Sequence, residues 1–242
     1  MPRKPLTQAE IDAFMARRQR RLERWRRPLE TRWDRVRAWT NMLLVDHGVI
    51  RLAYLNLHPV GARAWRSAQP MPHQIRAFAR RGGQSVVSLR GGQTFGSLPL
   101  ELEACARERL KYHNFVLRSR SLPDRETIRE MAALFERLDY PVLFHCKSGA
   151  DRAGFICAVY LMLAEGRPVA EARRQLSLRY GHVRQGKTGV LDAFFDAYEA
   201  DTGGQVPLLD WVETAYDPER ITRDFRASGW GVLVSDTLLR RE

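Results

Sequence analysis

The stretch of residues 141–164 most constrains what this chain can fold into, because a short apolar run leads through a polar loop into a longer apolar run. Residues 141–144 (PVLF) predict a strand buried on both faces, and residues 152–164 predict a buried helix. The loop therefore joins the end of a strand to the start of a helix. The first amides of a helix lack internal partners and, with the helix dipole, attract anions. This stretch predicts an anion site.

The loop holds a cysteine, a glycine and an arginine at spacings that suit phosphate chemistry. Gly149 allows the backbone to turn its N–H groups inward. Arg152 follows Cys146 by six positions, and its planar guanidinium can bind two phosphate oxygens. The same positive field favours the thiolate of Cys146, which is the nucleophilic form. The pattern predicts attack of a thiolate on phosphorus.

The sequence HCKSGADRAG of residues 145–154 resembles the phosphate loop of the cysteine-dependent protein tyrosine phosphatase superfamily, which reads H-C-x-x-G-x-x-R. The matching residues are His145, Cys146, Gly149, Arg152 and Gly154. Residues 65–70 (WRSAQP), 86–91 (VVSLRG) and 122–124 (LPD) are similar to the compact dual-specificity branch, especially its atypical, inositol-phosphate-directed members. The resemblance covers roughly residues 46–200.

The resemblance implies a role for each loop residue. Cys146 is the expected nucleophile and Arg152 the expected phosphate ligand. The expected substrate-binding residues are His145, Lys147, Ser148, Gly149, Ala150, Ala153 and Gly154. Ala153 departs from the family, in which most members carry Ser or Thr here, and the hydroxyl supports the departing thiolate. We therefore expect slower turnover of the phosphocysteine intermediate.

Two aspartates are candidates for the carboxylic acid that protonates the leaving oxygen. Asp124 precedes a helix expected at residues 125–138, where the family places its acid-bearing loop, but an aspartate there also suits a helix N-cap. Asp151 lies inside the phosphate loop and is expected to pair with a cation such as Lys147 or to be protonated. Both alternatives stay open at this point.

The formal net charge of +12 favours anionic partners. Residues 1–45 predict a basic amphipathic helical extension in which arginines are dense from residue 17 to residue 37. Apolar residues recur there at three- and four-residue steps: Leu22, Trp25, Leu29, Trp33, Val36 and Trp39. This face either binds an anionic membrane surface or docks on the catalytic domain. We do not expect nucleic acid as a partner, because no nucleic-acid-binding fold accompanies the arginines.

The three cysteines form no C-x-x-C pair and have no histidine at metal spacing, so we expect neither a metal nor a cofactor. The basic N-terminus is followed by no apolar stretch, and the longest apolar run, residues 153–164, is too short for a bilayer. These features predict a cytoplasmic protein, peripheral at the membrane if the basic extension binds lipid.

Strands that alternate with helices predict an α/β fold with a mostly parallel central sheet flanked by helices, and with helical N- and C-terminal extensions. Strands are expected at residues 50–55, 64–67, 85–89, 113–117 and 141–144. Helices are expected at residues 72–81, 99–110, 125–138, 152–164, 169–180, 190–200 and 207–216, and after Pro218. Residues 232–234 form a short apolar run. The expected domains are the extension (1–45), the catalytic domain (46–200) and a C-terminal appendage (201–242).

Together these features predict a metal-independent phosphomonoester hydrolase that acts through a phosphocysteine intermediate. A protein tyrosine or dual-specificity phosphatase is the first choice, with a phosphorylated protein as substrate. An inositol-phosphate or phospholipid phosphatase is the alternative, although lipid-directed relatives usually carry a lysine where this chain has Ala150. A noncatalytic phosphate-binding module is a further alternative, which Ala153 favours and the Cys146–Arg152 pair opposes.

Overall fold

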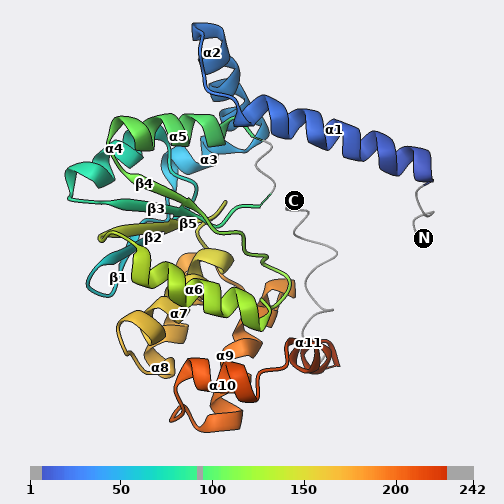
Figure 1. Cartoon of the computed structure of the whole chain (residues 1–242), viewed down its shortest axis with the longest axis vertical. Helices are drawn as coiled ribbons and strands as arrows, with labels where there is room; N and C mark the ends of the chain where they lie inside the picture. Colours follow the sequence, from blue (N-terminus) through green and yellow to red (C-terminus); the bar gives the residue numbers. More distant parts are fainter. Residues whose placement is uncertain (1–6, 92–94, 228–242) are drawn as a thin grey trace. The chain divides into compact units, whose positions relative to one another are not determined.

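The central feature of the computed structural model, which describes residues 7–91 and 95–227, is a mostly parallel sheet flanked by helices (Figure 1). Within the described residues, five strands lie in the order β1-β2-β5-β3-β4. Their bounds are β1 His58–Val60, β2 Ala64–Ser67, β3 Ser85–Ser88, β4 Lys111–Asn114 and β5 Val142–His145. The β1 and β2 strands are antiparallel, and the other neighbours are parallel. The predicted α/β fold class is confirmed.

The helices begin and end close to the predicted positions over much of the chain. Their bounds are α1 Gln8–Arg26, α2 Arg32–Thr40, α3 Gly48–Ala53, α4 Pro72–Arg80, α5 Ser97–Arg107, α6 Arg125–Arg137, α7 Asp151–Ala164, α8 Val169–Ala172, α9 Val190–Thr202, α10 Leu208–Thr214 and α11 Pro218–Ala227. A π-helical turn, Asn41–Val45, follows α2. None of the described helices is both long and apolar enough to cross a membrane.

The chain divides into two compact units. The first unit comprises the described residues within Met1–Tyr54, Pro70–Arg81 and Gly92–Leu110, and the second comprises those within Leu55–Gln69, Gly82–Gly91 and Lys111–Glu242. The whole sheet and the loop after β5 lie in the second unit. The units interleave along the chain, and the domain boundaries at residues 45 and 200 stay a prediction.

The core of the second unit is built around β5 and α7. All four residues of β5 are buried, and α7 is buried continuously from Ala153 to Leu161. Helices α6, α9 and α10 add apolar side chains to the same core. Phe194, Phe195 and Trp211 form an aromatic group there with Tyr216, which follows α10. Burial of each large apolar side chain stabilises the fold by about 1.5–3 kcal/mol. This core holds the strand end and the helix start that flank the loop.

The first unit has a smaller core. Trp25, Ala38, Met42, Met71 and Leu100 are buried together, with Leu29, Trp39 and Leu43 packed against them. Thr7 caps α1 and Thr31 caps α2, each through a capping box. The N-terminal helices therefore share a core with residues 71 and 100, which the sequence assigned to the catalytic domain.

The predicted apolar face of residues 22–39 is only partly correct. The chain leaves helical geometry between α1 and α2, because Pro28 cannot continue a helix and Thr31 starts a new one. The break changes the phase of the pattern, so Trp25 is 8% exposed, whereas Trp33 is 72% exposed.

Two predictions of secondary structure are wrong. Residues 50–55 were expected to form a strand, but residues 48–53 form α3, in which Arg51 turns inward to an ion pair with Asp46 at 3.0 Å. The helix expected at residues 169–180 ends at Ala172, and 3-10 turns replace its second half. The strand expected at residues 113–117 begins earlier, at Lys111, in register with Ser85. The apolar run at 232–234 lies outside the described residues.

Candidate active site

The β5 strand delivers Cys146 to the carboxyl edge of the parallel sheet. His145, the last residue of β5, pairs in register with Ser67 of β2 and Ser88 of β3. The Leu89 N–H donates to the His145 carbonyl at 2.9 Å, so the strand is held on this side up to its final residue. Cys146 follows at once and is 1% exposed. Residues 146–150 then turn into α7.

Gly149 gives the loop its shape. Its N–H donates to Cys146 Sγ at 3.2 Å, and its φ of +74° lies in the left-handed region. A Cβ at this position would lie 2.6 Å from the Ala68 nitrogen and 2.7 Å from the Ser67 carbonyl carbon. Both atoms belong to backbone that cannot move aside cheaply. Only glycine fits, and the fit aims a backbone donor at the sulfur.

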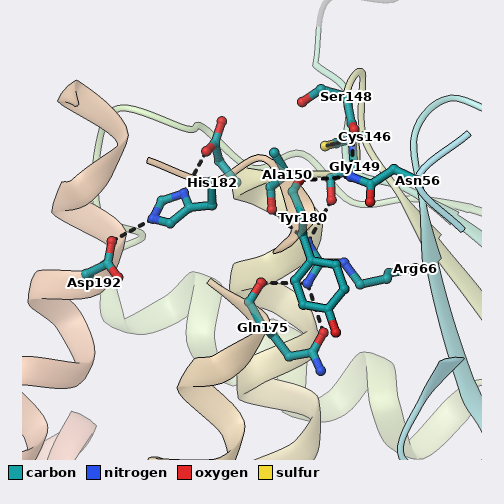
Figure 2. Close-up of polar contacts among 11 residues, drawn as sticks. Asn56, Arg66, Cys146, Ser148, Gly149, Ala150, Gln175, Tyr180, His182 and Asp192 are labelled. Carbon is teal, nitrogen blue, oxygen red and sulfur yellow. Dashed lines mark hydrogen bonds and ion pairs between the residues drawn. The ribbon is translucent and has the colours of Figure 1, made fainter. Parts of the chain in front are cut away.

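Arg66 of β2 holds the same loop from behind (Figure 2). Its Nη2 donates to the Gly149 carbonyl at 2.7 Å and the Ala150 carbonyl at 2.9 Å, and its Nη1 donates to the Gln175 carbonyl at 2.6 Å. The guanidinium also stacks on the Tyr180 ring, with its carbon 4.0 Å from the ring centroid. The side chain is fully buried, and this burial lowers the pKa of Arg66, while the nearby thiols of Cys157 and Cys146 oppose the shift.

No role was predicted for Arg66 beyond its place in the resemblance of residues 65–70 (WRSAQP). The position of Arg66 within a predicted strand could have indicated a structural role, because a charged side chain that becomes buried needs several polar partners. Asn56 was also missed. Its Nδ2 donates to the Ser148 carbonyl at 3.1 Å and the Tyr180 carbonyl at 2.9 Å, and no local pattern marks it.

Asp151, the first residue of α7, lies against the ring of His182. His182 Nδ1 lies 2.7 Å from Asp151 Oδ1, and His182 Nε2 lies 2.6 Å from Asp192 Oδ2 (Figure 2). Burial alone would lower the pKa of His182, but the hydrogen bonds to Asp151 and Asp192 raise it to about 9. His182 is therefore a buried imidazolium between two carboxylates at neutral pH. No role was predicted for His182 from the sequence.

Asp124 is the N-cap residue of α6. Its Oδ1 accepts a hydrogen bond from the Thr127 N–H at 2.8 Å, and the side chain is exposed. The hydrogen bonds from Thr127 lower the pKa of Asp124, so the carboxylate form is favoured. The helix-start interpretation thus describes the position that Asp124 occupies.

The remaining predicted residues lie in or beside the loop. His145 and Ala150 are buried, Lys147 is half-buried and Ser148 is exposed. Arg152 is the second residue of α7 and is half-buried, and Ala153 is buried one position later. Gly154 cannot carry a side chain, because a Cβ there would lie 2.6 Å from the Gln175 carbonyl oxygen. The structure thus brings together the predicted loop residues on one strand-to-helix connection, while Asp124 lies at the start of α6.

A buried cysteine that receives a backbone N–H lies in a strand-loop-helix unit with an arginine in the first helical turn, and this arrangement suits the binding of an anion. The comparisons with known proteins support this interpretation. A model described as the tyrosine phosphatase family matches residues 97–170, which include the whole loop. Over this segment the chain resembles the tyrosine phosphatase family, and the match supports a phosphatase. No curated protein matches the chain.

Solved structures with a similar arrangement share few identical residues with this chain. TpbA of P. aeruginosa is 16% identical, with a TM-score of 0.44, over 71% of this chain and 91% of TpbA. A putative phosphatase of Shewanella putrefaciens is 17% identical, with a TM-score of 0.47, over 64% of this chain and 97% of its own. Tk-PTP in its active form is 21% identical, with a TM-score of 0.44, over 53% of this chain and 86% of its own.

Proposed function

We propose that this protein is a metal-independent phosphomonoester hydrolase that acts through a phosphocysteine intermediate on Cys146. The observation that carries the proposal is the N–H of Gly149, which donates to Cys146 Sγ at 3.2 Å within a loop that only glycine can form. This contact places a backbone hydrogen-bond donor beside the sulfur that would attack phosphorus. Buried Arg66 adds a positive charge behind the loop.

The chemistry takes two steps. The Cys146 thiolate attacks phosphorus, the bond from phosphorus to the leaving oxygen breaks, and an acid gives that oxygen a proton. Arg152 and the loop amides bind the equatorial oxygens, on which charge is concentrated. Water then attacks the phosphocysteine, the bond from sulfur to phosphorus breaks, and the thiolate and inorganic phosphate are released. Ala153 offers no hydroxyl to the departing thiolate, so we expect the second step to be slow.

The acid is Asp124 or Asp151. For Asp124 to act, the hydrogen bonds from Thr127 that favour its carboxylate form must break, as movement of the segment before α6 would allow. Asp151 already has an oxygen engaged by His182, which ties it to the loop wall. We propose Asp124 as the acid and Asp151 as part of the binding loop.

We further propose a phosphorylated protein as substrate, with a tyrosine or dual-specificity preference, and inositol or lipid phosphates as the alternative. The three cysteines are free and buried, which suits the reducing cytoplasm. Exposed Trp33 and Val36 lie among the arginines of residues 17–39, and this combination favours association with an anionic membrane surface.

The test is hydrolysis of a generic aryl phosphate by the wild-type protein and by Cys146→Ser. Turnover by wild type, loss of turnover in Cys146→Ser and retained binding of inorganic phosphate by that variant are the expected results. Turnover by Cys146→Ser would refute the covalent mechanism. Phosphate binding without turnover by wild type would instead indicate a noncatalytic module. Phosphopeptides, inositol phosphates and phospholipids then rank the substrates.

A further inference from the structure

We propose that His182 and Asp192 are positioning residues that neutralise Asp151 and thereby hold the phosphate loop in a form that binds a dianion. The inference rests on the proposed function and adds to it a regulated property of the same site, its dependence on the charge of one buried histidine. Asp151 and Asp192 are the charged groups that face His182, from α7 and α9 respectively.

The geometry favours a charged ring. His182 is 1% exposed, and each of its two ring nitrogens faces a carboxylate oxygen, at 2.7 Å and 2.6 Å. A neutral imidazole carries one donor and one acceptor, so it would place a lone pair against one of the carboxylates. The imidazolium donates from both nitrogens and satisfies both contacts. The two contacts raise the pKa of His182 to about 9 in spite of its burial.

The charge of this ring bears directly on the phosphate loop. Asp151 is the residue next to Arg152, so an unpaired carboxylate there would repel a bound phosphate and compete for the guanidinium. The His182 imidazolium offsets that negative charge. Asp192 lies on the other side of the ring, where its carboxylate keeps the ring protonated without contacting Asp151. His182 and Asp192 together therefore allow an anion to bind to the loop in spite of the carboxylate of Asp151.

The segment that carries His182 is anchored on α9 by several ion pairs. Asp192, Asp196 and Glu199 are spaced by four and three positions and therefore share one face of α9. Arg173 pairs with Asp196 at 2.5 Å and also with Glu199, and Arg184 pairs with Asp196 at 2.6 Å. These contacts fix both ends of residues 173–184.

The same segment also reaches the back of the loop. Gln175 accepts hydrogen bonds from Arg66, and Tyr180 stacks on the Arg66 guanidinium. Arg66 in turn binds the loop carbonyls of Gly149 and Ala150. Residues 173–184 therefore support the loop at two places, through Arg66 and through the contact between His182 and Asp151 (Figure 2).

A purely structural cross-link makes different predictions from this positioning role. A cross-link alone would affect stability, and its loss would leave the pH dependence of phosphate binding unchanged. The positioning role predicts that wild type loses affinity for inorganic phosphate as pH rises through about 9, where the ring loses its proton. The ligand itself is already a dianion well below this pH.

The experiment measures the inhibition constant of inorganic phosphate, and KM and kcat with an aryl phosphate, between pH 7 and pH 10. We expect His182→Gln to weaken phosphate binding and raise KM about 10-fold or more at pH 7, with a smaller change in kcat, and to abolish the inflection near pH 9. Asp192→Asn is the milder variant, in which the inflection moves to lower pH. His73→Gln and Asp210→Asn alter exposed residues of α4 and α10 and should match wild type.

A double variant gives the decisive comparison. If charge compensation is the role, adding Asp151→Asn to His182→Gln should restore most of the phosphate affinity, because no carboxylate remains to be neutralised. A double variant no better than His182→Gln, together with an unchanged inflection in Asp192→Asn, would overturn the inference while leaving the proposed function intact.

The inference can also be tested without turnover. Cys146→Ser protein with isotope-labelled histidine should show a doubly protonated His182 ring at pH 8, and inorganic phosphate should shift its signals and raise its titration midpoint. A ring that is neutral at pH 8, or is unmoved by phosphate, would overturn the inference even if wild type hydrolysed no ester. Absence of hydrolysis in wild type, with phosphate-sensitive His182 signals, would refute only the proposed function.

Discussion

Replacement of Gly149 by alanine should distort the phosphate loop at a cost that the structure allows to be divided into two parts. Holding a residue with a Cβ at φ +74° costs about 1–2 kcal/mol. The contacts of that Cβ with the Ala68 nitrogen at 2.6 Å and the Ser67 carbonyl carbon at 2.7 Å add about 1–3 kcal/mol, because backbone must move. The expected total is about 2–5 kcal/mol.

Gly82→Ala is the matched control. Its φ is +86°, and a Cβ there would meet no described atom within 4 Å, so only the conformational cost of about 1–2 kcal/mol applies. Urea unfolding of both variants isolates the steric part as their difference. Activity on an aryl phosphate should fall at least about 100-fold in Gly149→Ala, because its N–H leaves Cys146 Sγ, and should be retained in Gly82→Ala. Equal losses of stability and equal activities in the two variants would refute the reasoning.

The other predictions concern the supports of the loop, the acid, the pH and the membrane. Arg66→Met should leave the carbonyls of Gly149 and Ala150 without their donor, at a cost in stability of about 1–3 kcal/mol for each carbonyl. It should also weaken phosphate binding in a titration, whereas the matched change at an exposed position, Arg63→Met, should not. Equal phosphate binding by the two variants would contradict this role of Arg66. Asp124→Asn keeps a good N-cap, so its effect on activity should come from loss of the acid. Hydrolysis of an alkyl phosphate should become slower, and hydrolysis of an activated aryl phosphate should not. If only Asp151→Asn shows this selectivity, Asp151 is the acid. The raised pKa of His182 adds folding stability that is fully present below pH 6.5 and is lost as pH rises through about 9. The urea concentration at the unfolding midpoint should therefore fall over this pH range in wild type and stay level in His182→Gln. Trp33→Ala should lower binding to anionic vesicles while its stability stays within about 0.5 kcal/mol of wild type, because Trp33 is exposed. Trp25→Ala should instead lose about 3–5 kcal/mol of stability, because Trp25 is buried. Unchanged vesicle binding by Trp33→Ala would exclude the exposed face around Trp33 as the membrane anchor.

Local sequence was sufficient for the strand-loop-helix unit. The apolar runs before and after the loop are each buried by the same core, so their periodicity identified β5 and α7 nearly to the residue. Gly149 and Cys146 are three positions apart, and the hydrogen bond between them closes within the loop itself. Contacts of this kind depend on few residues, and their spacing is visible in the chain.

Short alternating segments were less informative. Residues 50–55 were expected to form a strand, yet residues 50–53 belong to α3, in which Arg51 forms a buried ion pair with Asp46. In the N-terminal extension, the same three- and four-residue steps include buried Trp25 and exposed Trp33. The helix is broken at residues 27–31, between the two tryptophans. Trp25 is buried because it packs in a core with Met71 and Leu100, which are distant in sequence.

Tertiary structure alone decided what supports the loop. Arg66 lies about 80 positions before the loop carbonyls that it binds and reaches them because β2 pairs with β5. Asn56 precedes β1 and binds the carbonyls of Ser148 and Tyr180, which are even more distant in sequence. His182 meets Asp151 because α9 holds residues 173–184 against the start of α7. The residues that react thus form a local motif that sequence determines by itself. The charges and hydrogen bonds that hold this motif in place come from distant segments, since burial of a polar group requires partners that only the folded chain brings together.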